Sequence, residues 1–251
     1  MTNDQALTEY LLRLADTDMV LAQRFCEWCG NAPALEEEMA MLNAGLDLIG
    51  QARNWYDYVA ELRDDGRDAD FLAFRRNERE YRNLLIAEQP RGDYAVTTAK
   101  QFFFDVWHHL VLTRLTESND ERIAGIAAKG LKEVTYHRRR STEWMLRLGQ
   151  GTDESHRRLT DAVQSLWRFT YELTDTDEIE DQLAEAGIGA GNVGDAWRNE
   201  VARVFAEAGL ALPEPARHFY MDGKNGKHTE HLGFLLAEMQ YLPRAYPDAT
   251  W

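Results

Sequence analysis

Apolar residues recur at intervals of three and four along most of this chain, and no alternating runs typical of β-strands are found. Residues 4–30 show the pattern most clearly, because one seam contains Leu7, Leu11, Leu14, Asp18, Leu21, Phe25 and Trp28. Such a seam forms one face of an amphipathic helix. The sequence therefore predicts a helix over residues 4–30, with Thr2 or Asn3 as its N-cap and Asp18 in the middle of its apolar stripe.

The same periodicity predicts six further helices. They cover residues 34–62, 94–116, 121–148, 153–174, 193–208 and 229–241. The helix over 94–116 is apolar on nearly every face, so we expect it to be central. No repeat, low-complexity run or flexible linker interrupts the pattern. We therefore predict one all-α domain over residues 1–251, a four-helix bundle with additional C-terminal helices.

Composition and charge exclude several classes of protein to which the chain could otherwise belong. The chain has 251 residues, of which 44% are hydrophobic, so it can bury a large core. Its net charge of −15 repels nucleic-acid phosphates and anionic membrane surfaces, which argues against both as partners. Two cysteines cannot form a disulfide framework, and no stretch approaches the roughly 20 apolar residues of a membrane span. With no basic and apolar leader at its start, the chain is predicted to be cytoplasmic.

Each of the four long predicted helices carries one polar residue near its middle. These residues are Asp18, Asp47, Asp105 and His137. A polar side chain in a core seam is costly unless it is paired, coordinated or hydrated. The separation from Asp18 to Asp47 is 29 residues, and that from Asp105 to Val134 is also 29. Two antiparallel hairpins would therefore place each pair at one level and bring the four polar residues into one layer.

This layer has the frame of a di-iron carboxylate site but not its full ligand set. Such a bundle supplies one Glu from each of two helices and a Glu-x-x-His pair from each of the others. Gly50 stands where a histidine is needed and Val134 where a glutamate is needed, and His108 does not complete the set. We therefore favour a metal-free polar core without catalytic residues or cofactor. The alternatives are a mononuclear or adventitious metal site and a functional di-iron centre. The vestigial di-iron positions are Asp18, Asp47, Gly50, Asp105, Val134 and His137.

The seam assigned to the second helix is unusually polar and small. It contains Ala40, Asn43, Asp47, Gly50 and Asn54, with larger apolar groups beside it. On the fourth helix, the run from Arg138 to Arg140 is most simply a solvated face opposite His137, and otherwise part of a subunit interface. Residues 71–82 are rich in aromatic and arginine residues, which fits either an exposed docking surface or a strap across the chain's own bundle.

Four stretches are long and idiosyncratic. They read LDLIGQARN at 46–54, NLLIAEQP at 83–90, LWRFT at 166–170 and KHTEHLG at 227–233. In these stretches, and over almost its whole length, the chain resembles the C subunit of ring 1,2-phenylacetyl-CoA epoxidase. That enzyme is a bacterial multicomponent oxygenase of phenylacetate degradation. The resemblance implies a ferritin-like fold.

The resemblance also implies a role. In that complex a catalytic A subunit holds the di-iron site and inserts one oxygen atom into the ring of phenylacetyl-CoA. A small B subunit is required, and a reductase delivers electrons from NADPH. The C subunit pairs with the A subunit and has lost the iron ligands. We therefore expect a non-catalytic structural subunit in a hetero-oligomer with the A and B subunits, in transient contact with the reductase. When alone, the chain could form a homodimer.

Two other functions are weighed against this one. The first is a metal-bearing ferritin-like oxygenase component with its own incomplete or mononuclear site. The second is a ferritin-like binding module with a ligand in its bundle. This acidic chain also contains a small cluster of basic residues. Its members are Lys224, Lys227, His228 and His231. The cluster is either a polar helix start or a contact with the partner subunit or a CoA phosphate.

Overall fold

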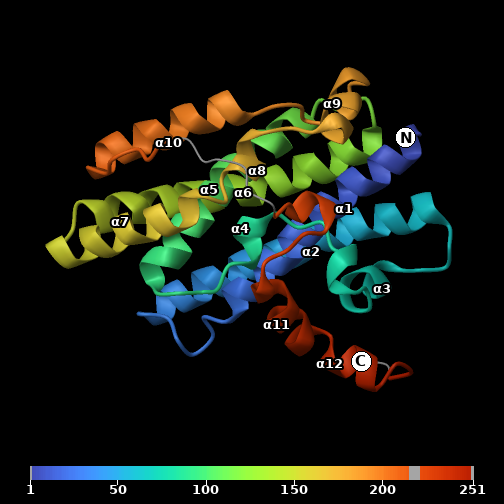
Figure 1. Cartoon of the computed structure of the whole chain (residues 1–251), viewed down its shortest axis with the longest axis horizontal. Helices are drawn as coiled ribbons and strands as arrows, with labels where there is room; N and C mark the ends of the chain where they lie inside the picture. The colour runs from blue at the N-terminus through green and yellow to red at the C-terminus, as the bar shows by residue number, and fades with distance from the viewer. Residues whose placement is uncertain (1, 215–220, 250–251) are drawn as a thin grey trace. The chain divides into compact units, whose positions relative to one another are not determined.

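The computed structural model describes residues 2–214 and 221–249 and confirms the all-α fold class (Figure 1). Within those ranges no β-strand is present, and only an isolated bridge joins Asp222 to Lys227. No helix in the described part of the chain is long and apolar enough to cross a membrane. The chain is divided into two compact units, formed by residues 1–90 with 219–251 and by residues 91–218. The single domain predicted over residues 1–251 stays a prediction.

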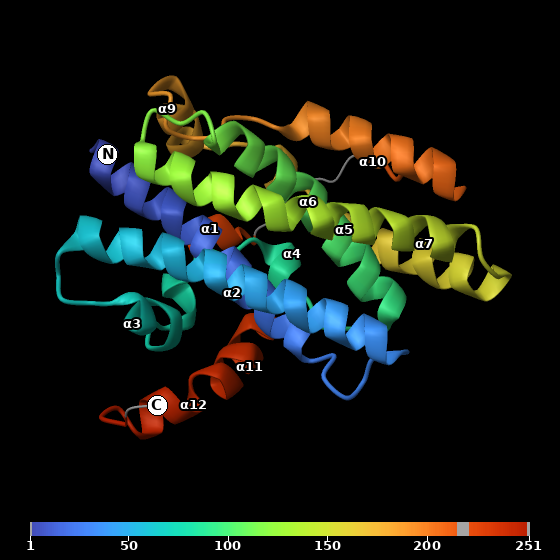
Figure 2. The same cartoon turned by 180° about the vertical axis from the view of Figure 1, so that it is seen from behind.

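The first unit is built on an antiparallel hairpin of α1 (Asn3–Cys26) and α2 (Leu35–Arg63), which run side by side in Figures 1 and 2. Thr2 caps α1 in a capping box with Gln5. Gly45 faces α1, and a Cβ atom there would lie 3.4 Å from the Ala22 carbonyl oxygen, an ordinary van der Waals contact. The remaining helices of this unit are α3 (Ala69–Phe74), η1 (Glu78–Glu80), α4 (Leu85–Glu88), η2 (Gly223–Asn225), α11 (Glu230–Met239) and α12 (Tyr241–Ala245).

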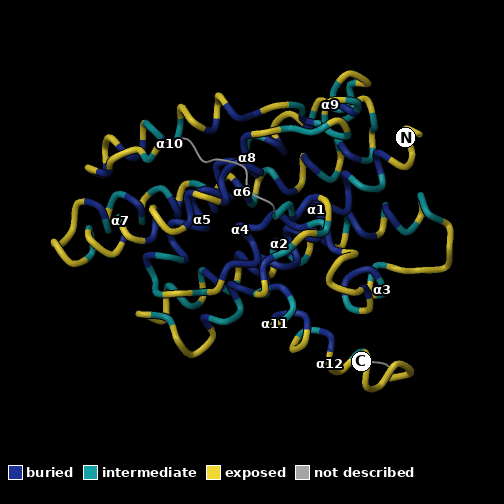
Figure 3. The backbone as a smooth tube through the Cα atoms, viewed as in Figure 1, coloured by how far each residue is buried: buried dark blue, intermediate teal, exposed yellow. Residues whose placement is uncertain are grey.

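The second unit is built on the hairpin of α5 (Tyr94–Leu115) and α6 (Glu121–Gly149). Residues 97–108 of α5 are all buried, as the almost wholly apolar run predicts, and Figure 3 shows this stretch in dark blue. The side chains of Asp93 and Asp120 accept hydrogen bonds from the first backbone N–H groups of α5 and α6. The remaining helices are α7 (Asp153–Trp167), α8 (Tyr171–Thr174), α9 (Glu178–Glu185) and α10 (Gly194–Ala208).

The C-terminal part of the second unit differs from its sequence prediction in two ways. Residues 153–174 form two helices rather than one, because the chain turns between Trp167 and Tyr171. Helix α9 was not predicted, since it is short and strongly acidic. Helix α10 packs through Trp197, whose ring lies 5.8 Å from that of Phe103 and whose Nε1–H donates to the Phe103 carbonyl oxygen at 2.9 Å.

Candidate functional site

The α5–α6 hairpin encloses a group of five buried polar residues. We call it the α5–α6 polar cluster; its members are Asp105, His108, His137, Arg140 and Ser141. The Asp105 carboxyl group lies within electrostatic reach of His137, Ser141 and Arg140. The Ser141 hydroxyl donates to the Arg138 carbonyl oxygen at 3.2 Å. The antiparallel hairpin thus brings the polar seam residues of its two helices together. Both helices run without a break through this region, so they hold these side chains on a rigid backbone.

Burial shifts the pKa values of two members of this cluster, Asp105 and His108. It raises the pKa of Asp105 from 3.8 to about 7, against the opposing effects of His137, Ser141 and Arg140. It lowers the pKa of His108 from 6.5 to about 3, in the same direction as the effects of His137 and His109. Near neutral pH the Asp105 carboxyl group is therefore only partly ionised, and His108 is a neutral imidazole.

Arg140 departs from its sequence prediction. It is only 8% exposed, and its guanidinium donates to the Gln101 side-chain oxygen and the Tyr94 hydroxyl, both at 3.2 Å. The solvated face predicted for the arginine run is therefore wrong for this residue, although Arg139 is exposed. The cause is helical geometry, because a residue three positions after His137 lies on the same face of the helix. A fixed positive charge thus lies beside the Asp105 carboxyl group.

The side chains of the α5–α6 hairpin do not fit half of a di-iron site. The fully buried Val134 offers no donor where a carboxylate would be needed. Asp105 is a weak ligand near neutral pH while it holds its proton, and the neighbouring Arg140 guanidinium opposes a second cation. In neither unit do the described residues include three or more His, Cys, Asp or Glu side chains grouped to hold a metal ion.

The predicted positions on the first hairpin are not equally buried. Asp18 is buried on α1, whereas Asp47 is half-buried and Gly50 is exposed on α2. The buried face of α2 instead contains Met41, Ala44, Gly45, Leu48, Gln51, Ala52, Trp55, Tyr56 and Val59. The seam assigned to this helix is therefore offset from its core face, because α2 carries apolar residues on two faces. The single layer of four polar residues involves both units and stays a prediction.

Sequence reasoning missed the buried ion pair of Asp16 and Arg76, whose side chains are 0% and 2% exposed. One Asp16 oxygen accepts from the Tyr56 hydroxyl at 2.6 Å, and the other accepts from the backbone N–H of Arg82 at 2.7 Å. Arg76 also lies over the ring of Tyr81, 4.3 Å from its centroid. The aromatic and arginine segment is thus a strap across its own unit at these residues. The sequence signal was the run of three polar residues, 16–18, within an apolar helix.

A second buried acid, Glu88, holds the C-terminal segment to α4. Its carboxylate accepts from the backbone N–H and the hydroxyl of Thr229, both at 2.6 Å, and from Asn83 at 2.9 Å. His228 Nδ1 lies 2.8 Å from the same carboxylate, and the His228 side chain is fully buried. Arg24 donates to the Glu88 carbonyl oxygen at 2.7 Å. The strap and this segment are therefore joined to the α1–α2 hairpin by buried polar bonds.

The predicted basic cluster is not one exposed patch. Lys224 is buried, as is the His228 side chain, and Lys227 is exposed. His231 is half-buried, and its carbonyl oxygen accepts from Arg24 at 3.1 Å. Contact of this cluster with a partner or a CoA phosphate stays a prediction. Lys227 and His231 are the members exposed enough to make such a contact.

The fold and the clusters define a class of protein: an all-α chain of two helical hairpins, each of which buries polar residues. Comparison with known proteins agrees with the resemblance seen in the sequence. The PaaA_PaaC family, described as phenylacetic acid catabolic protein, matches residues 1–251. The C subunit of 1,2-phenylacetyl-CoA epoxidase from Escherichia coli (strain K12) is 51% identical over 247 residues, which are 98% of this chain and 99% of the relative. The chain therefore belongs to the PaaA_PaaC family.

Proposed function

We propose that this chain is a non-catalytic structural subunit of a 1,2-phenylacetyl-CoA epoxidase. It holds the catalytic A-type subunit in its active arrangement, within a hetero-oligomer that also contains the small B subunit and transiently binds the reductase. The similarity to the C subunit of such an epoxidase supports membership in a complex of this kind. The absence of oxygen-activating chemistry is supported by the residues themselves.

The observation that carries the proposal is the mismatch between the side chains and a di-iron ligand set. Two of the six positions, Gly50 and Val134, have no coordinating atom, and Arg140 places a guanidinium beside Asp105. Two irons require about four carboxylates and two histidines, with open positions for oxygen. The chain can nevertheless promote catalysis by mass action, since a partner that binds only the folded, competent form of the A-type subunit stabilises that form.

Metal counting on separated chains tests this proposal. The chain is co-expressed with its A-type partner, the complex is purified, and the two chains are separated under native conditions before elemental analysis. We expect near two irons per A-type chain and far below one metal ion of any kind per copy of this chain. A stoichiometric metal on this chain that is lost in a His137→Gln variant would contradict the proposal and would favour the metal-bearing alternative.

A further inference from the structure

Helix α2 carries a second apolar face that its own unit does not cover. We call it the α2 stripe; it consists of Leu35, Met39, Leu42, Leu46 and Ile49. Leu35, Met39 and Leu46 are 71%, 52% and 64% exposed, and the other two members are half-buried. The stripe is distinct from the core face, since its members interleave with buried residues such as Met41 and Leu48. Exposed apolar surface of this extent on one element is typical of an interaction site.

The spacing of the α2 stripe specifies the shape of what binds it. Its members follow one another in steps of four, three, four and three residues, which is the repeat that lets one helix pack along another. From Leu35 to Ile49 the stripe is about 21 Å long at roughly 1.5 Å per residue. Figure 2 shows α2 as one unbroken helix over this stretch. The occupant that fits best is therefore another helix with an apolar seam of comparable length.

Charge beside the stripe argues against a second copy of this chain. Glu36, Glu37 and Glu38 follow the first stripe residue, and Asp47 lies next to Leu46. In a parallel pair of copies, each acidic residue would lie beside the same residue of the other copy. Two chains of net charge −15 also repel each other at long range. Basic side chains flanking the partner's seam would instead be attracted.

We propose that the α2 stripe is the surface on which this chain docks a helix of the catalytic A-type subunit, whose apolar seam is flanked by basic side chains. The inference rests on the proposed function. A di-iron subunit is itself a helical bundle and so offers long helices at its surface. The rigid backbone of α2, fixed along its opposite face by the unit's own core, presents the stripe without reordering on binding.

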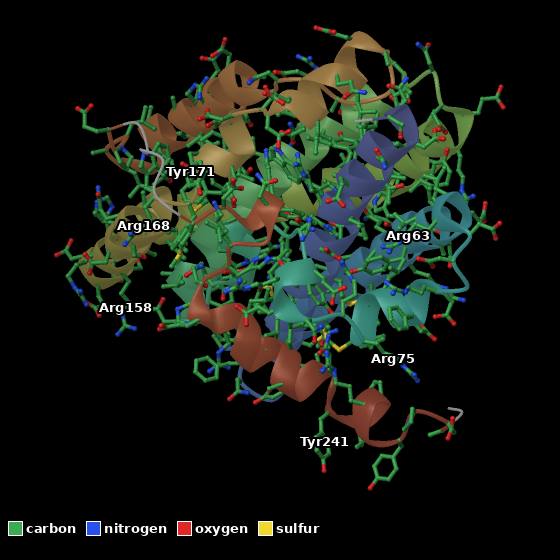
Figure 4. The ribbon with its side chains drawn as sticks, turned by 45° about the vertical axis from the view of Figure 1, so that its right-hand side comes forward. Arg63, Arg75, Arg158, Arg168, Tyr171 and Tyr241 are labelled. Atoms are coloured by element: carbon green, nitrogen blue, oxygen red, sulfur yellow. The ribbon has the colours of Figure 1, made fainter. Side chains whose placement is uncertain are left out.

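A competing apolar surface lies at the C-terminal end of the same unit. Phe234, Tyr241, Leu242 and Tyr246 on or beside α11 and α12 are 48–71% exposed, and Figure 4 shows Tyr241 directed away from the ribbon. Tyr241 lines one groove, and Leu242 and Tyr246 line another. The four residues lack a helical repeat long enough to seat a helix. Leu242 supplies a variant that distinguishes this surface from the α2 stripe.

Binding of the full-length chain to the A-type subunit of the same complex, measured by titration calorimetry, tests the inference. We expect Leu46→Glu to weaken binding about 30-fold or more, as truncation of a central interface residue does. Leu212→Glu is the matched control, because Leu212 is 52% exposed in the second unit, and it should change affinity less than about twofold. Unchanged circular dichroism and melting temperature show that both variants fold.

A charge variant tests the chemistry of the partner. Glu36→Lys combined with Glu37→Lys should slow association about tenfold at low salt, and the difference should shrink as salt is added. Faster association would contradict basic flanks on the partner.

The outcomes separate the docking surface from the function. If the wild-type chain binds the A-type subunit and Leu46→Glu does not weaken binding, the α2 stripe is the wrong surface while the structural role stands. A larger effect of Leu242→Glu would also overturn it, in favour of the C-terminal surface. If the wild-type chain self-associates and Leu46→Glu abolishes that, the occupant is a second copy. If the wild-type chain does not bind the A-type subunit at all, the proposed function itself fails.

Discussion

Replacing Arg76 by methionine should lower the free energy of unfolding by about 3–5 kcal/mol, the range found when one partner of a buried ion pair is removed. Methionine keeps most of the apolar volume but leaves the Asp16 carboxylate, which is 0% exposed, without its guanidinium. Asp16 would retain its bonds from the Tyr56 hydroxyl and the Arg82 backbone, which is why the loss should stay within that range. Urea unfolding at pH 7 followed by circular dichroism measures the effect.

The neighbouring arginine supplies the control. Arg75 is exposed and donates to the Pro247 carbonyl oxygen at 2.7 Å, so Arg75→Met should change stability by less than about 1 kcal/mol. The double variant Asp16→Asn with Arg76→Met should be more stable than the sum of the two single changes predicts, because the stranded charge is removed. A loss below about 1 kcal/mol for Arg76→Met would show that the pair does not hold the strap to α1.

Changing Asp105 to asparagine should reshape the dependence of stability on pH. Between about pH 4 and 7 the folded chain keeps the Asp105 proton that the unfolded chain has released, so this group makes stability fall as pH rises. His108 acts in the opposite sense between about pH 3 and 6.5, because only the unfolded chain binds its proton there. In the wild-type chain these two opposing slopes nearly cancel. The contribution of the cluster to the free energy of unfolding should therefore change little with pH.

Asp105→Asn removes the falling contribution and leaves the rising one. Stability of this variant should climb by roughly 1.4 kcal/mol per pH unit between about pH 4 and 6.5. At pH 8 it should exceed that of the wild type by roughly 2–4 kcal/mol, since the variant has no ionised carboxylate at position 105. His108→Asn should show the opposite slope, and Asp161→Asn, at an exposed position, should match the wild type. Urea midpoints measured across this pH range test the prediction. Parallel curves of stability against pH for all four proteins would show that Asp105 and His108 do not carry these opposing pH dependences.

The helices that periodicity predicts are those long enough for the repeat to stand out. The hairpins α1–α2 and α5–α6 have four turns or more of apolar seam, so their bounds come close to prediction. Helix α9 spans only Glu178–Glu185 and escaped notice, because two turns are too short for the apolar repeat to stand out among its acidic residues. The existence and the bounds of a long helix therefore follow from its local sequence pattern. Which of its faces is buried depends on what packs against the helix.

The polar clusters illustrate that limit. Asp105 and His137 could be placed together because a hairpin relates them by simple register. Asp16 and Arg76 are 60 residues apart, and Glu88 and Thr229 are 141 apart, so no local pattern connects them. The two apolar faces of α2 were likewise indistinguishable in sequence. One is the core face, and the other is the stripe to which we assign a partner.

The central claim is that this chain supports a catalytic partner and performs no chemistry of its own. Phenylacetyl-CoA turnover by the A-type subunit, with the B subunit and reductase present, measures it directly when this chain is omitted and then restored. We predict that turnover falls at least tenfold without the chain, and that the wild type and an Asp105→Asn, His137→Gln double variant restore it equally. Full turnover without the chain, or failure of the folded double variant to restore it, would contradict the account.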